Sequence, residues 1–211
     1  MTFRGHAYLT YAVWITLCVA FVSALIGGRW SLAFVAVLTF VLSIAPALAV
    51  ARFHIQLPLS FFAGIVLFIF GTIFLGEAFD FYERYWWWDI ALHGGSAVGF
   101  GLIGFLFVLT LFEGDRLAAP HWALALITFC FAMAIGVSWE VFEFAMDQIF
   151  GLNMQKSGLV DTMWDLIVDM IGASIAVLAG FAYLKGRDRR GLAWVIAEFV
   201  RLNKRFFTRQ R

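Results

Sequence analysis

The stretch Asp161-Thr-Met-Trp-Asp165-Leu-Ile-Val-Asp169-Met-Ile-Gly172-Ala173 opens the last long apolar segment of this chain. Its aspartates recur at every fourth residue, and on a helix this spacing places them on one face, one above another. Asp161 stands where a helix N-cap is expected, so capping alone accounts for it. Asp169 lies about 12 Å further along the helix. A carboxylate at that depth in a bilayer is costly unless it is paired, protonated or bound to a cation.

The composition places the chain among integral membrane proteins. Of its 211 residues, 63% are hydrophobic and 14% are charged, whereas a soluble domain is about half apolar and about a quarter charged. Cys18 and Cys130 both lie in apolar segments, which fits small packing residues and offers no disulfide framework. The sequence therefore predicts an all-α, polytopic membrane protein.

Six apolar segments are long enough to cross a bilayer as helices. They run from about Tyr8 to Ile26, Ser31 to Val50, Leu59 to Gly76, Asp89 to Phe112, His121 to Asp147, and Asp161 to Leu184. We expect these spans to form one transmembrane domain of residues 1–190.

The remaining residues, 191–211, form a basic tail. Within it, Gly191–Phe207 carries apolar residues at helical spacing, with Arg201, Lys204 and Arg205 off that stripe. A basic amphipathic helix beside a membrane is typical of the cytoplasmic interface, where it binds anionic lipid headgroups. Docking of a partner protein is the alternative role for this helix, and nothing indicates nucleic-acid binding.

The basic residues predict the orientation of the spans. Six spans place both ends of the chain on one side, and most basic residues fall on that side. They are Arg4, Arg52, Arg116, Lys185, Arg187, Arg189, Arg190, Arg201, Lys204, Arg205, Arg209 and Arg211, against Arg29, Arg84 and Lys156 on the other side. The positive-inside rule then predicts that both termini lie in the cytoplasm.

Acidic residues gather at the opposite, outer ends of the last three spans. Carboxylates and an imidazole converging from neighbouring helices are typical of metal sites in helical bundles. Hard oxygen donors with one nitrogen suit Mg, Mn, Fe or Zn. The predicted ligands of a divalent ion are His93, Glu140, Glu143, Asp165 and Asp169, with Asp89 as a spare carboxylate and general base. Interhelical hydrogen bonding is the structural alternative for these residues.

Small residues follow His93 and favour close packing of its helix. Gly95 and Gly99 form a GxxxG pattern, flanked by Gly94, Gly101 and Gly104. Because small residues let helix backbones approach closely in lipid, this pattern would bring His93 near its neighbours.

Three motifs together resemble a known family. They are Asp89-xxx-His93, Trp139-Glu140-xx-Glu143-Phe144, and Asp161-Thr-xx-Asp165-xxx-Asp169-xx-Gly172-Ala173. This set is similar to that of the YjdF-like bacterial inner-membrane proteins, which distantly resemble VanZ-like proteins. The resemblance covers roughly residues 60–184. It implies a multi-pass inner-membrane protein but no settled activity.

Three functions fit these observations. The first is a metal-dependent site in the outer half of the membrane that acts on a lipid or lipid-linked substrate. The second is a non-catalytic membrane subunit or assembly factor of a larger complex. The third is a cation or proton pathway, although no acids continue such a path through the inner half of the spans.

Overall fold

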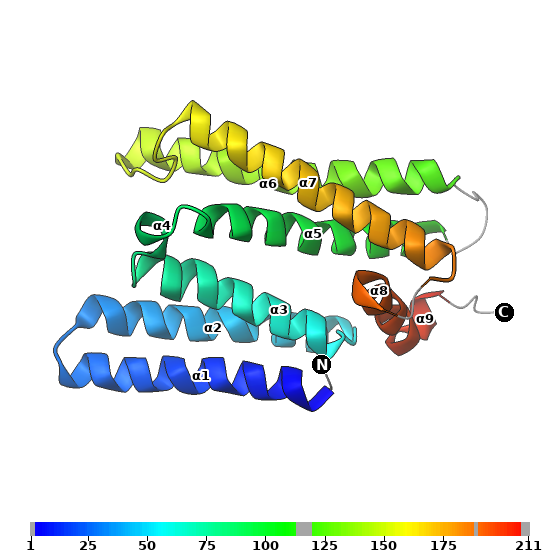
Figure 1. Ribbon diagram of the computed structural model, residues 1–211. Coiled ribbons are helices and arrows are strands. Elements are labelled where there is room, and N and C mark those ends of the chain that lie inside the picture. The colour runs from blue at the N-terminus through cyan, green and yellow to red at the C-terminus, as the bar shows by residue number, and fades with distance from the viewer. Residues whose placement is uncertain (1–2, 113–119, 188–189, 208–211) are drawn as a thin grey trace. The chain divides into compact units, whose positions relative to one another are not determined.

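The computed structural model describes residues 3–112, 120–187 and 190–207, and this part of the chain is all-helical. Six helices are long and apolar enough to cross a membrane. They are α1 (Phe3–Ile26), α2 (Trp30–Phe53), α3 (Leu59–Ile69) with its π-helical continuation η1 (Phe70–Glu77), α5 (Trp88–Phe112), α6 (His121–Phe150) and α7 (Leu159–Leu184). The shorter helices are α4 (Phe81–Arg84), α8 (Gly191–Leu202) and α9 (Lys204–Phe207), as Figure 1 shows. The predicted fold class is confirmed.

Some residues used for the predicted orientation lie outside the described part of the chain. They are Arg116, Arg189, Arg209 and Arg211. Residues 1–2 of the predicted transmembrane domain and residues 208–211 of the predicted tail also lie outside the described part of the chain.

Several helices are longer than predicted. α1 begins at Phe3 rather than near Tyr8, and α6 continues to Phe150. α2 passes through Pro46 and ends at Phe53, where His54 adopts a left-handed backbone conformation. The predicted span already passed Pro46 and ended near Val50, so α2 continues beyond it through the basic residue Arg52.

The prediction that Asp161 is a helix N-cap is wrong. α7 begins at Leu159, two residues earlier, and the cap position belongs to Gly158. Gly158 has a φ of +66°, which a residue with a side chain rarely adopts. Asp161 therefore lies within the first turn, where a carboxylate is favoured by the helix dipole.

The first compact unit of the chain ends at Trp88. In it, α1 and α2 are joined by a turn at Gly28, which has a φ of +65°. Its core includes Leu17, Val66 and Phe74. The indole of Trp88 donates a hydrogen bond of 3.3 Å to the carbonyl oxygen of Gly71 in the π-helical segment. This bond satisfies a carbonyl in a segment where the regular helical ladder is altered.

The second unit, Asp89–Arg211, contains α5 to α9. α7 packs along α6, and Figure 1 shows the two helices crossing. α5 and α7 meet through small residues, because a Cβ added at Gly172 would lie 2.7 Å from both the Ala97 side chain and the Gly94 carbonyl. Close approach through small residues is a common basis of helix packing in lipid.

The predicted GxxxG pair, Gly95 and Gly99, does not form this contact. A Cβ added at either position meets no described atom within 4 Å. The contact instead uses Gly94 and, about two turns further along the same helical face, Gly101, which lies against Ala176. The close packing of α5 was therefore predicted, but the GxxxG pattern identified the wrong face.

The predicted C-terminal helix is present and packs against α7. Ile196 is fully buried, whereas Arg201, Lys204 and Arg205 are exposed. The buried carboxylate of Glu198 accepts two hydrogen bonds from the Arg201 guanidinium, and this pairing lowers the pKa of Glu198. The division into a domain of residues 1–190 and a tail of residues 191–211 stays a prediction.

Candidate functional site

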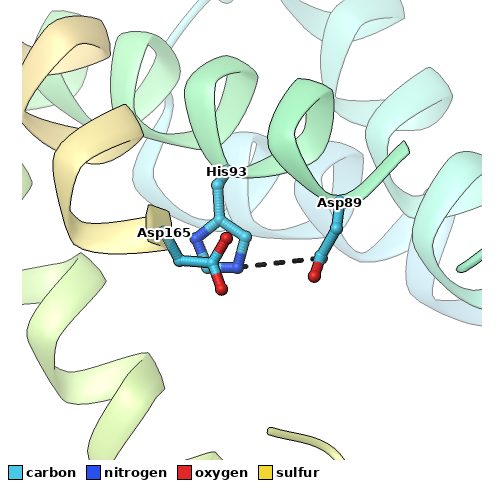
Figure 2. Close-up of side chains that lie close together, drawn as sticks. All are labelled: Asp89, His93 and Asp165. Carbon is cyan, nitrogen blue, oxygen red and sulfur yellow. Dashed lines mark ion pairs between the residues drawn. The ribbon is translucent and has the colours of Figure 1, made fainter. Parts of the chain in front are cut away.

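His93 lies at the centre of the acidic cluster. It stands near the start of α5 and is buried. Asp89 precedes it by one helical turn on the same face, and Oδ1 of Asp89 lies 3.9 Å from Nε2 of His93. Figure 2 shows both side chains projecting from α5 toward the same region, with Asp165 entering from α7.

α7 contributes two carboxylates on one face. Asp165 and Asp169 are both buried, and Asp169 is only 1% exposed. Oδ1 of Asp169 lies 3.5 Å from Nδ1 of His93. The two ring nitrogens of His93 therefore face different acids, because Nδ1 faces Asp169 while Nε2 faces Asp89.

α6 contributes Glu140, which is 4% exposed. Its Oε1 lies 3.9 Å from Nε2 of His93, on the same ring nitrogen that faces Asp89. The end of α6 and the beginnings of α5 and α7 thus supply the side chains around one imidazole. The prediction that acids from these helices converge is confirmed for these residues.

One ligand atom from each of Asp89, His93 and Asp165 lies within 4.8 Å of the other two. Donors on opposite sides of a Ca²⁺ ion lie up to about 5 Å apart, because each bond measures about 2.3–2.6 Å. Smaller ions need shorter bonds of about 2.0–2.2 Å, which a modest side-chain rotation would supply. The three residues therefore have the types and spacing of a divalent-cation site.

The carboxylates of Glu140 and Asp169 form no hydrogen bonds. All four oxygens are buried, and none has a hydrogen-bond partner among the described residues. Buried polar atoms in folded proteins are nearly always hydrogen-bonded, since leaving one unpaired costs about 1–3 kcal/mol. These two side chains thus leave unsatisfied acceptors beside His93.

The position of Asp169 depends on a missing side chain across the helix interface. Gly136 on α6 faces Asp169, and a Cβ added at Gly136 would overlap the Asp169 carboxylate. A glycine at this position therefore creates the space that the carboxylate fills. No sequence pattern indicated this role, because Gly136 stands alone in an apolar segment.

Lys156 brings a positive charge to the edge of the cluster. Its Nζ lies 3.7 Å from Oδ2 of Asp89, whose other oxygen faces His93. Lys156 entered the predicted orientation only, and this contact was not predicted. The one available signal was that Lys156 is the only basic residue between the last two predicted spans.

The remaining acids have other surroundings. Glu143, a predicted ligand, is half-buried and accepts a hydrogen bond of 3.0 Å from the Trp139 indole. Asp147 accepts backbone hydrogen bonds from the loop that follows α6. Asp80 forms an exposed ion pair with Arg84 in the first unit.

Comparison with known proteins adds a family but no activity. A family model described as "Predicted membrane protein (DUF2238)" matches residues 8–186. An uncharacterized protein of Thermotoga maritima is 33% identical over 115 residues, or 54% of this chain. The match spans 57% of that relative's length. No solved structure matches the chain. Because the family model covers most of the sequence, including every residue of the acidic cluster, this chain belongs to the DUF2238 family of predicted membrane proteins.

Proposed function

We propose that this multi-pass membrane protein binds a divalent metal ion beside His93 and uses it to act on a lipid or lipid-linked substrate. The ligands in this proposal are Nε2 of His93 and carboxylate oxygens of Asp89, Glu140 and Asp165. Asp169 orients the imidazole from Nδ1, 3.5 Å away. A carboxylate on the second ring nitrogen is a common partner of metal-bound histidines.

The observation that carries this proposal is a pair of buried carboxylates, Glu140 and Asp169, that share the single imidazole of His93. Neither carboxylate accepts a close, well-aligned hydrogen bond among the described residues. One imidazole can neutralise at most one of the two charges, so hydrogen bonding between helices leaves the pair poorly compensated. A cation satisfies several carboxylates at once, because it neutralises their charges and accepts their lone pairs as ligands.

The types of donor atom limit which metal ions suit the site. One imidazole nitrogen with several carboxylate oxygens suits Mg, Mn, Fe or Zn, whereas a thiophilic ion would require cysteine. Both cysteines lie on other parts of the helices, outside the acidic cluster. We therefore expect a hard or borderline divalent ion.

The proposed chemistry is hydrolysis. A divalent ion in a site of this kind lowers the pKa of a bound water and so supplies a nucleophile near neutral pH. Asp89 was expected to be the base and Glu143 a ligand, but Asp89 lies within the group around His93. We propose that the two exchange roles, so that half-buried Glu143 receives the proton.

The place of the site in the membrane favours a lipid substrate. Asp89 lies in the first turn of α5 and forms the shallow edge of the cluster, whereas Glu140 and Asp169 lie deeper along α6 and α7. Lipid headgroups occupy the corresponding depth of a bilayer. The narrower resemblance to YjdF-like proteins is compatible with this proposal and names no substrate. The exposed basic residues of α8 and α9 are proposed to contact anionic lipid.

Elemental analysis of the wild-type protein tests the metal proposal. Protein purified in detergent without chelator is expected to carry close to one divalent ion per chain, because one histidine and its surrounding acids form a single site. The measurement is metal per chain by mass spectrometry, with a chelator-treated sample as control. A wild type that carries no ion and takes up none from Mn²⁺, Zn²⁺ or Mg²⁺ buffers contradicts the proposal.

The proposed orientation places the site on the outer face. Lys156→Cys and Lys204→Cys are expected to label oppositely with an impermeant thiol reagent in intact cells, in a background lacking Cys18 and Cys130. Lys156 lies between α6 and α7, whereas Lys204 lies in the tail. Labelling of the Lys204→Cys variant from outside would reverse the orientation.

A further inference from the structure

The side chain of Lys156 lies at the rim of the acidic cluster. It is 28% exposed, and its partner Asp89 is 24% exposed, whereas Glu140, Asp165 and Asp169 are buried. Lys156 and Asp89 therefore lie at the solvent-accessible edge of the site, where a substrate would first meet it.

The loop between α6 and α7 fixes the position of Lys156. Asp147 at the end of α6 accepts backbone hydrogen bonds from Met154 at 2.7 Å and from Gln155 at 3.0 Å. The Gln155 side chain donates a hydrogen bond of 2.7 Å to the Thr162 hydroxyl on α7. The residue just before Lys156 is thus tied to both helices of the site.

The backbone of Lys156 itself has an uncommon conformation. Its φ of +33° lies in the left-handed region of backbone conformations, which residues other than glycine, asparagine and aspartate seldom adopt. A glycine or an asparagine would adopt this conformation at a lower cost than a lysine. Its presence there is explained if the position of the ammonium group matters more than the backbone cost.

We propose that Lys156 binds a phosphate group of the substrate, which bridges the Lys156 ammonium and the ion held beside His93. This inference rests on the proposed metal site. An anion approaching this cluster meets several carboxylates, so the ion alone leaves it in a field of negative charge. A lysine ammonium at the rim offsets that field, and lysine commonly binds phosphate as a point charge.

Asp89 lies between the two groups that are proposed to bind the phosphate, which are the Lys156 ammonium and the ion beside His93. Its Oδ1 faces His93 and its Oδ2 faces Lys156 at 3.7 Å. Charge-assisted hydrogen bonds are shorter, about 2.7–2.9 Å, so this ion pair is loose. An ion that engages Asp89 would weaken the carboxylate's attraction for Lys156 and so strengthen the ammonium's net attraction for an anion.

Lys156→Gln tests the proposal because it should change two affinities in opposite directions. Loss of the nearby positive charge is expected to raise Mn²⁺ affinity about threefold to tenfold, by removing Coulomb repulsion. The same change is expected to lower phosphate affinity of the Mn²⁺-loaded protein about tenfold or more. Both affinities are measured by calorimetry on the full chain in detergent.

Two probes distinguish the source of the phosphate. Inorganic phosphate represents a soluble ligand, and dihexanoyl phosphatidic acid represents a lipid headgroup. Binding of either probe that depends on Lys156 supports the proposal. A preference for the lipid identifies a membrane source, whereas equal affinity identifies the phosphate alone as the recognised group.

Two control variants separate a local effect from general damage. Lys156→Arg keeps the charge and is expected to retain most of both affinities. Arg84→Gln removes one charge from an exposed ion pair in the first unit and is expected to change neither affinity. A parallel fall of both affinities in Lys156→Gln overturns the proposal, as does a Mn²⁺-loaded wild type that binds neither probe. A wild type that binds no metal overturns the metal site together with this inference.

Discussion

Asp165→Asn is expected to remove the divalent ion and, with it, the protein's sensitivity to chelator. Asp165 is buried and lies within 4.8 Å of donor atoms of Asp89 and His93. Asparagine has nearly the same shape, but its amide is neutral and a far weaker ligand for a hard cation. The variant should therefore keep the fold while losing stoichiometric metal.

Thermal unfolding measures this difference. A ligand that binds only the folded protein stabilises it by about 4 kcal/mol when its concentration is 1,000 times its dissociation constant. Chelator should thus lower the melting temperature of the wild type by several degrees. It should leave the melting temperature of the Asp165→Asn variant unchanged.

Without metal, the order of melting temperatures should be reversed, so that the Asp165→Asn variant is more stable than the wild type. Without an ion, the wild type holds several buried carboxylates at close range in a low dielectric, which is unfavourable. Removing one charge relieves part of that repulsion, so Asp165→Asn should melt above the chelated wild type.

Asp161→Asn is the matched control on the same helix. It lies one turn before Asp165, is half-buried, and is not part of the group around His93. Because Asp161 offers no ligand atom to that group, this variant should still bind the ion and lose melting temperature in chelator, although removing its charge also relieves some repulsion on Glu140 and Asp165. If the wild type and both variants melt alike in chelator and in excess metal, the cluster has a packing role and the metal proposal fails.

Gly136→Ala is expected to weaken metal binding by about 10–100-fold, although Gly136 offers no ligand atom. Its added methyl group would occupy the space of the Asp169 carboxylate. Asp169 faces Nδ1 of His93, and loss of such a partner of a metal-bound histidine typically costs this much affinity. Asp169 must move, because the overlap involves a carboxylate that is buried among helices.

The effect on stability should be smaller than the effect on affinity. Overpacking of a buried contact costs about 1–3 kcal/mol, while alanine gains up to about 1 kcal/mol over glycine in a helix. Gly99→Ala is the control, because a Cβ there meets no described atom within 4 Å. It should leave both affinity and stability nearly unchanged.

A spectroscopic measurement separates positioning from general damage. Nitrogen chemical shifts of the His93 ring report which nitrogen carries the proton, and Asp169 favours a proton on Nδ1. Gly136→Ala should alter that tautomer in the metal-free protein. Wild-type shifts and wild-type metal affinity in this variant would falsify the role assigned to Gly136 and Asp169.

Much of the fold follows from local features of the sequence. Apolar segments of sufficient length predict spans, and six of them are present. The four-residue spacing of Asp165 and Asp169 places both on one helical face, and both are buried beside one histidine. Such predictions succeed because helix geometry depends on residues that are close in the chain.

The residues at which helices begin and end were predicted less well from such local features. The end of an apolar segment near Val50 and an aspartate at position 161 are ordinary signals of a helix end and a helix cap. Yet α2 continues to Phe53, and α7 begins before Asp161. The backbone conformation of Gly158 decided where α7 begins. A glycine permits a left-handed conformation without requiring it, so the sequence did not reveal which signal would prevail.

Composition and helical spacing assign the acids and His93 to faces of particular spans, so the residues that could form a site were recognisable from the sequence. Which of these acids meet the imidazole depends on how far each helix rotates and slides against the next, and this became known only from the packed structure. Gly172 sets α7 against α5, Gly136 makes room for Asp169, and the α6–α7 loop brings Lys156 to Asp89. Each of these contacts joins residues far apart in the chain, and helical periodicity within one segment carries no information about the helix packed against it.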